Sequence, residues 1–380
     1  MRVLNVVSIL SAREGGGNAE RTAQLTRAIQ SRDVSCTVLT LDIGRPDERV
    51  ADIAGASLIV LPCLSSRFQI PRGGWWKVVA AVRDSEVVHL MGYWTVLGAM
   101  AYLAARRHGV PYVVSPAGAL PIFGRSRWLK RLYNLVVGRN LIRHASGWIA
   151  VTTAEFPHFE TYGIQRFQVT VIPNGVWESD FSMGDGDEFF RATGVPRGPF
   201  VLFVGRLNPI KGPDLLLEAF GQLAGEFPGF RLVFAGPDEG MQAELEARIR
   251  GLNLSGRVIF CGFVSGQMKT AAYKAARLLV VPSRSEAMSL VAVEAGICGT
   301  PVLMTDQCGL NELGKVSSGL IVAASIDGLT AGLRFVLANP VRLAEWGEGW
   351  RSIVRERFLW RNLAKQFTSL LEEVTYKKVR

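Results

Sequence analysis

The chain has 380 residues, of which 48% are hydrophobic and 20% charged, with 40 Gly and 17 Pro. This is the composition of a globular protein with about two domains, and it excludes a disordered chain, a collagen and a disulfide-rich miniprotein. The five cysteines lie far apart without a CxxC pair. That spacing argues against a zinc site and favours a reducing, cytoplasmic compartment.

The net charge of +10 lies mostly in the first half of the chain, where residues 1–180 contain 20 Lys/Arg and 13 Asp/Glu. A basic half of this kind indicates an anionic partner, such as a phosphorylated ligand or an acidic membrane surface. No arginine- and aromatic-rich RNA motif or zinc finger accompanies it, so nucleic acid is not expected as a partner.

Short apolar runs alternate with helical patterns along the chain, and they lack polar alternation, as expected of parallel strands buried on both faces. Two successive series predict an α/β protein with two doubly wound, Rossmann-like domains. The polar, Gly- and Pro-containing stretch 177–199 is the expected boundary, giving domains 1–178 and 179–359. The strands are expected at 3–9, 38–41, 58–61, 87–90, 112–115, 148–151 and 169–172, and then at 200–204, 231–235, 258–261, 278–281 and 301–304.

Three loops that follow predicted strands contain candidate binding residues. The first has Gly16 and Gly17 before a predicted helix, where glycines let a phosphate approach the backbone and the helix N-terminus. Because the loop does not match GxGxxG, a glycine turn without a ligand remains an equal alternative.

The second loop joins Gly205 and Arg206 to Lys211 directly after a predicted strand. It is not a Walker motif, because the second glycine and the Ser/Thr are missing. Two cations five residues apart are suited to clamping a diphosphate, although a solvated pair is the plain alternative.

The third loop contains Glu286 and is followed by a predicted helix that starts near Ser289 and contains Glu294. A carboxylate in such an apolar segment needs partners, since an unpaired buried charge is costly. Sugar or ribose hydroxyls would supply them, and so would an internal salt bridge.

Together these loops resemble the retaining GT-B-fold glycosyltransferases of family GT4. The likeness spans most of the chain and is strongest from 200 to 312. The motifs that carry it are Gly16-Gly17, Val204-Gly205-Arg206-(x)4-Lys211-Gly212 and Glu286-(x)7-Glu294 continuing to Gly299-Thr300-Pro301-Val302.

The resemblance implies two domains facing across a cleft, with a C-terminal helix of about 360–380 that crosses back to the acceptor-side domain, and metal-independent transfer from a nucleotide-sugar. Arg206 and Lys211 would neutralise the leaving diphosphate, and Glu286 would hold hydroxyls of the donor sugar. Glu294 would bind the ribose diol. The remaining donor contacts would come from Gly16, Gly17, Gly205, Ser289, Leu290 and Val291.

The acceptor-side motifs depart from this family. Ala117, before Gly118, stands where relatives often have His, and Met91 replaces a second family histidine. His89 is a candidate to compensate. These changes leave open a nucleotide-sugar-binding protein without transfer activity as the alternative to a transferase acting in polysaccharide or glycolipid synthesis.

The segment Ile122–Arg143 contains six Lys/Arg and no acidic residue, with apolar residues at helical spacing. One interpretation is peripheral docking on an anionic membrane, at the inner face of the plasma membrane, where a lipid-linked acceptor would be presented. The other is an ordinary helix that faces the core and has a solvated cationic side.

Overall fold

The computed structural model describes residues 1–11, 13–53, 55–122 and 126–376. The chain forms two compact units. Unit 1 comprises Met1–Gly175 together with the last helix, α14 (Trp360–Tyr376), and unit 2 comprises Val176–Leu359. The chain therefore enters unit 2 three residues before the boundary that the sequence suggested at residue 178.

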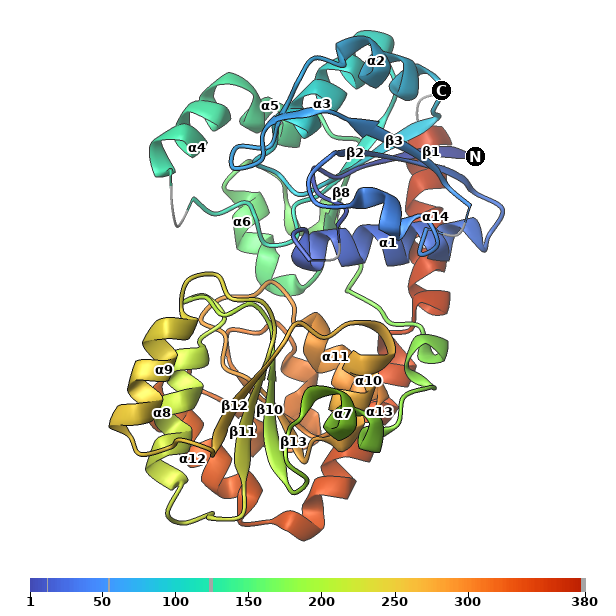
Figure 1. The fold of residues 1–380 in the computed structure, drawn as a ribbon. Helices are drawn as coiled ribbons and strands as arrows, with labels where there is room; N and C mark the ends of the chain where they lie inside the picture. Colours follow the sequence, from blue (N-terminus) through green and yellow to red (C-terminus); the bar gives the residue numbers. More distant parts are fainter. Residues whose placement is uncertain (12, 54, 123–125, 377–380) are drawn as a thin grey trace. The chain divides into compact units, whose positions relative to one another are not determined.

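Unit 1 contains a parallel sheet of seven strands in the order β3-β2-β1-β6-β7-β8-β9 (Figure 1). The chain moves outward from β1 in one direction and then restarts beside it with β6, which is the doubly wound topology. The strands are β1 (Arg2–Val6), β2 (Ser35–Leu41), β3 (Ser57–Leu61), β6 (Val87–Met91), β7 (Tyr112–Ser115), β8 (Gly147–Ala150) and β9 (Val169–Val171), with a separate hairpin of β4 (Cys63–Ser65) and β5 (Ile70–Pro71).

Helices cover both faces of this sheet, and every residue of the central strands β6 and β7 is buried. The last helix, α14, packs against α1 through a buried stripe from Trp360 to Val374 at helical spacing. The helices of unit 1 before α14 are α1 (Gly16–Gln30), α2 (Trp75–Arg83), α3 (Val96–His108), α4 (Arg127–Tyr133), α5 (Arg139–Arg143) and α6 (Phe156–Glu160).

Unit 2 repeats the topology with six parallel strands in the order β12-β11-β10-β13-β14-β15. Helices α8 and α9 lie on one face of the sheet, and α10 and α11 on the other (Figure 1). The elements are β10 (Phe200–Val204), β11 (Arg231–Ala235), β12 (Val258–Gly262), β13 (Leu278–Val281), β14 (Val302–Thr305), β15 (Ile321–Val322), α7 (Gly186–Thr193), α8 (Pro213–Leu223), α9 (Gln242–Gly251), α10 (Gly266–Ala275), α11 (Leu290–Ile297), α12 (Ile326–Leu337) and α13 (Leu343–Arg357).

The predicted α/β class with two doubly wound domains is confirmed by these sheets. The stretch 177–199 is not a bare linker, because it contains α7. Phe189 of α7 is fully buried and stacks on Phe200 at a ring distance of 5.6 Å. No helix within the described ranges is long and apolar enough to cross a membrane.

Candidate functional site

The loop after β10 holds the first two candidate residues, Arg206 and Lys211, and leads into α8. Because β10 lies between β11 and β13, this loop starts at the point where the strand order of unit 2 reverses. Ligands of open α/β sheets bind at such a point, outside the carboxyl ends of the strands. Gly205, at the start of the loop, donates its N–H to the carbonyl of Ala235 over 2.9 Å, which ties the loop to the end of β11.

Close backbone contacts bring three loops together at this edge. Gly212 has a φ of +67°, and a Cβ there would overlap the carbonyl oxygen of Pro282 in the loop after β13. Gly309, with the same φ, approaches the carbonyl of Ala287 in the same way. Both positions need glycine for its backbone freedom and for its missing side chain. As a result, the loops after β10, β13 and β14 pack against one another.

Lys211 and Glu286 form an ion pair across this cluster, although 75 residues separate them in the chain. The same carboxylate oxygen accepts a hydrogen bond of 3.0 Å from the hydroxyl of Ser283. The Lys211 side chain is 27% exposed and that of Glu286 is 8% exposed. A cation and a carboxylate thus lie next to each other in the loops that follow β10 and β13, where the strand order reverses.

Arg206 is engaged by a residue that the sequence analysis did not select. Its guanidinium donates to Glu239, in the loop after β11, over 2.8 Å, and the pair is about two-fifths exposed. Asn208 donates to the other oxygen of Glu239 over 2.7 Å and accepts the N–H of Lys211 over 3.0 Å. Glu239 and Asn208 therefore link the two cations of the loop.

The start of α11 supplies hydrogen-bond donors without partners. Leu290 and Val291 occupy the first helical positions, whose N–H groups have no acceptor within the helix. Ser289 precedes them, and its hydroxyl is buried without a partner among the described residues. A buried hydroxyl beside free N–H groups at a helix N-terminus is suited to an anionic oxygen.

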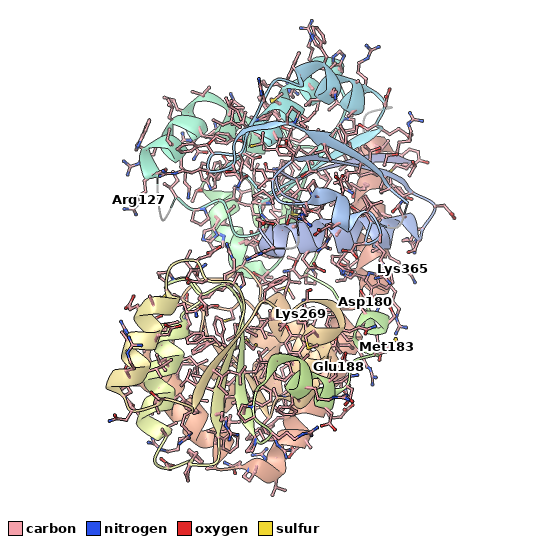
Figure 2. The ribbon with its side chains drawn as sticks, viewed as in Figure 1. Arg127, Asp180, Met183, Glu188, Lys269 and Lys365 are labelled. Atoms are coloured by element: carbon pink, nitrogen blue, oxygen red, sulfur yellow. The ribbon has the colours of Figure 1, made fainter. Side chains whose placement is uncertain are left out.

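Glu294 of α11 is buried, and the salt bridge foreseen as an alternative is present. Lys269 of α10, labelled in Figure 2, is one partner. It donates to one carboxylate oxygen over 2.8 Å, and the hydroxyl of Tyr273 donates to the other over 2.7 Å. Burial and the charge of Glu294 raise the pKa of Tyr273 well above its usual value, so this hydroxyl stays protonated. Both carboxylate oxygens therefore have a donor in the described structure.

The cluster in unit 2 thus combines two partly exposed cations, three carboxylates and a helix N-terminus. Chemically it is suited to a ligand that carries phosphates next to hydroxyl groups. Within the described ranges, no group of three His, Cys, Asp or Glu side chains is placed to hold a metal ion.

In unit 1, the glycine turn after β1 is held by steric contacts. A Cβ on Gly15 would overlap Ala19 and the carbonyl oxygen of Ser11. Gly15 is therefore the position in this turn that has no room for a side chain. Gly16 has a φ of +56° with open space around its Cα, and Gly17 lies in the exposed first turn of α1. The turn places both predicted glycines at the switch point between β1 and β6.

His89 lies inside β6 and is fully buried. Its Nδ1 pairs with Asn5 over 3.0 Å and its Nε2 with the hydroxyl of Ser115 over 2.8 Å, while its ring packs on Phe367 of α14. Burial, reinforced by the charge of Arg21, lowers the pKa of His89 to about 3, so the ring is neutral. The structure thus places this candidate in the core of unit 1, where it offers no surface to an acceptor.

Ala117 and Gly118 lie in the turn after β7, next to Glu155. Ala117 has a φ of +49°, which is uncommon for a residue with a Cβ. Gly118 donates its N–H to Glu155 over 2.6 Å, and Val151 donates to the other carboxylate oxygen over 2.7 Å. Burial raises the pKa of this carboxyl. Glu155 therefore joins the turn after β7 to the turn after β8.

Arg21 of α1 is a fully buried cation that the sequence analysis missed. It donates to the carbonyls of Ile172 and Pro173 and to the side chain of Asn174, over 2.7–2.9 Å. Burial lowers its pKa to about 10. Its position among the apolar residues of a predicted helix was the available signal. For Glu239, that signal was its place in a loop that follows a strand.

Comparisons with known proteins agree with this architecture. The family model of the glycosyl transferase 4-like domain matches residues 16–175, and that of glycosyl transferases group 1 matches residues 185–352. A crystal structure of HepE from Anabaena in complex with UDP-glucose superposes with a TM-score of 0.81 at 22% identity, covering 98% of this chain and 100% of that chain. This match confirms the GT-B fold.

Two curated relatives are D-inositol 3-phosphate glycosyltransferases. The protein of Actinosynnema mirum is 33% identical over 369 residues, which cover 87% of this chain and 86% of the relative. The protein of Acidothermus cellulolyticus is 29% identical over 389 residues, covering 92% of this chain and 84% of the relative. The chain therefore belongs to the glycosyl transferases group 1 family and is a glycosyltransferase.

Proposed function

We propose that this glycosyltransferase moves a sugar from a nucleotide-sugar to a polysaccharide precursor or a lipid-linked acceptor, with retention of configuration and without a metal ion. The related structure of HepE, which contains UDP-glucose, supports a nucleotide-sugar as the donor.

The contact between Lys211 and Glu286 is the observation that carries the donor assignment. In a nucleotide-sugar the distal phosphate is bonded to the sugar, so phosphate oxygens and sugar hydroxyls lie side by side. A cation and a carboxylate that touch each other across two loops match that arrangement. When the donor binds, the ion pair between Lys211 and Glu286 opens. Lys211 then pairs with the diphosphate, and Glu286 accepts hydrogen bonds from the sugar hydroxyls.

Arg206 and the start of α11 complete the proposed diphosphate site. Arg206 adds a second cation, and the N–H groups of Leu290 and Val291 with the hydroxyl of Ser289 provide neutral donors. Negative charge develops on the diphosphate as the bond to the sugar breaks. Preorganised cations and N–H groups aimed at that charge lower the barrier, and such electrostatic stabilisation is usually the largest single contribution to catalysis.

Glu294 is the proposed ribose ligand. Its carboxylate is fixed by Lys269 and Tyr273, and a carboxylate can accept about four hydrogen bonds, so acceptor capacity remains for a diol. Gly205, held to the end of β11, lets the backbone approach the nucleotide closely.

Retention is proposed to follow from attack on the same face of the sugar as the departing phosphate, assisted by that phosphate. This route needs no nucleophile from the enzyme. The two cations Arg206 and Lys211 supply the charge that a metal ion would otherwise provide, which supports the proposal of metal independence.

Unit 1 is proposed to bind the acceptor and to admit the diphosphate at Gly16 and Gly17. With His89 in the core, the turn at Ala117 and Gly118 is the acceptor-side candidate that remains. The names of the two relatives make D-inositol 3-phosphate one acceptor to test, beside a polyprenyl-linked sugar. The proposed location is the cytoplasm, peripherally at the inner face of the plasma membrane.

Thermal unfolding with UDP, GDP, ADP, dTDP and their sugar derivatives tests the donor site. A ligand at 100 times its Kd stabilises the native state by about 2.7 kcal/mol. We expect one base to raise the Tm, and its sugar derivative to raise it further. Glu286→Gln should remove the extra shift from the sugar but keep the shift from the diphosphate. The matched control Glu226→Gln, whose carboxylate pairs with Arg334 as that of Glu286 pairs with Lys211, should keep both.

Turnover of the nucleotide-sugar that binds, with and without EDTA, tests the chemistry. NMR of the product gives the anomeric configuration. Unchanged turnover in EDTA and a retained anomer are expected, whereas loss of turnover in EDTA or inversion would overturn that part of the proposal. If no nucleotide raises the Tm, the assignment of these residues as a donor site is wrong. Binding without turnover on any acceptor would favour the nucleotide-sugar-binding alternative.

A further inference from the structure

The segment from α4 to α5 exposes apolar side chains instead of burying them. It comprises α4, the π-helical turn Asn134–Gly138 and α5. No residue of α4 is buried. Four large apolar residues at helical spacing are 67%, 48%, 80% and 69% exposed; they are Trp128, Leu132, Leu135 and Val136, which we call the exposed face. The interpretation of an ordinary helix that faces the core does not describe these residues.

The segment is anchored to unit 1 through other residues. The hydroxyl of Tyr93 donates to Asn134 over 2.5 Å, and Asn134 donates to the hydroxyl of Tyr162 over 3.0 Å. Further along, Leu141 and Ile142 of α5 are buried in the core. The apolar side chains of the exposed face are therefore not needed to hold the helices in place. Their exposure requires another explanation, because clustered apolar surface commonly marks a site of interaction.

Positive charge surrounds the exposed face. Arg127, Arg131, Arg139 and Arg143 are exposed, and the segment Ile122–Arg143 has no acidic residue. Arg127 extends away from the body of unit 1 (Figure 2). Throughout the described part of the chain, none of these four arginines has an ion-pair partner. Residues 123–125, which complete the segment, lie outside the described residues.

We propose that the exposed face docks on an anionic lipid bilayer. Apolar side chains with a tryptophan enter the boundary between headgroups and acyl chains, while flanking arginines meet the anionic headgroups. Each Lys or Arg near such a surface strengthens binding about five-fold. A protein partner of matching charge would need acidic groups around an apolar patch, whereas a bilayer supplies both over any contact area. The docking does not depend on the donor site, so either proposal can fail without the other.

Vesicle sedimentation of the full chain tests the docking. We expect binding to vesicles of phosphatidylcholine with phosphatidylglycerol, and little binding to phosphatidylcholine alone. The variant Leu135→Ser/Val136→Ser removes apolar contact while keeping the charge, and it should weaken binding at least about 10-fold. The variant Arg127→Gln/Arg131→Gln/Arg139→Gln keeps the apolar face and should weaken binding about 100-fold.

Phe167→Ser is the matched control, because Phe167 is 85% exposed on unit 1 but outside the exposed face. It should bind vesicles like the parent protein. The Tm of each variant, with and without the nucleotide that binds, shows that the fold and the donor site persist. The proposal is overturned if parent protein stays in the supernatant with both vesicle types, or if neutral vesicles bind it equally. It is also overturned if sedimentation equilibrium shows self-association that Leu135→Ser/Val136→Ser abolishes, since a second copy would then occupy the face.

Discussion

The two units share one sheet topology but use their charged residues in opposite ways. Around the switch point of unit 2, Arg206 and Lys211 remain partly exposed and pair with carboxylates from neighbouring loops. Near the switch point of unit 1, Arg21, His89 and Glu155 are buried and have hydrogen-bond partners within the unit. Around its switch point, unit 2 therefore keeps two cations partly exposed to solvent, whereas unit 1 encloses Arg21, His89 and Glu155.

This difference indicates that the charged residues at the switch point of unit 2 are suited to binding a ligand, whereas those of unit 1 are suited to stabilising the fold. A partly exposed ion pair contributes little to stability and can exchange its partner for a ligand. A buried polar group with several hydrogen bonds is costly to disrupt, because its partners are left without bonds. Substitutions in unit 2 should therefore change activity more than stability, and substitutions in unit 1 should do the reverse.

The largest effect is expected for Arg206→Met/Lys211→Met. Turnover should fall about 100- to 1,000-fold, because in the proposed site these two cations stabilise the charge that develops on the leaving diphosphate. The free energy of unfolding should change by no more than about 2 kcal/mol, since Glu286 keeps its bond to Ser283. Arg334→Met, which removes an exposed arginine paired with Glu226, is the control and should keep full turnover. Steady-state kinetics and urea unfolding measure both; an equal loss in the control would contradict the comparison.

The next effect is a loss of stability in unit 1 from Arg21→Met. Three acceptors lose their donor; they lie on Ile172, Pro173 and Asn174. The free energy of unfolding should therefore fall by about 3 kcal/mol. Arg107→Met removes an exposed arginine of α3 and should change stability by less than about 0.5 kcal/mol. Urea unfolding measures both variants. If the two variants were equally stable, the assignment of Arg21 as a structural cation would be wrong.

A smaller effect follows from the neutral ring of His89. The folded protein holds its pKa at about 3, while the unfolded chain takes up a proton near 6.5. Protons then favour the unfolded state, so this residue lowers stability as the pH falls below about 6.5, by about 2 kcal/mol at pH 5. His89→Gln should reduce the difference between urea unfolding at pH 7 and at pH 5 by that amount. An unchanged difference would show that the ring does not stay neutral.

The smallest effect is expected for Glu239→Gln. In the proposed donor site Glu239 competes with the diphosphate for Arg206, and an exposed pair of this kind is worth less than about 1 kcal/mol. Neutralising it should tighten nucleotide binding by about 2- to 5-fold in a titration. Glu244→Gln, which alters an exposed partner of Arg248, is the control and should leave the affinity unchanged. Weaker binding in Glu239→Gln would show instead that this carboxylate orients Arg206.

The helices and strands near the switch points were predictable because apolar runs and loop glycines are local features of the chain. The strands β7, β10, β11 and β13 have the predicted bounds. The helix α7 was missed because the stretch 177–199 is polar and rich in glycine. In the structure, the packing of Phe189 on Phe200 and the contacts of α7 with α10 stabilise this helix, and Asp185 caps its N-terminus.

The amino-acid sequence by itself determined the α/β class, the two doubly wound domains and the loops in which the candidate residues lie. It also determined the basic, acid-free character of the segment Ile122–Arg143. The tertiary structure decided which partner each charge has and which side chains are exposed. Lys211 meets Glu286 across 75 residues, His89 is enclosed, and Leu135 and Val136 face outward. Burial and pairing depend on residues brought together from distant parts of the chain, and no local pattern contains that information.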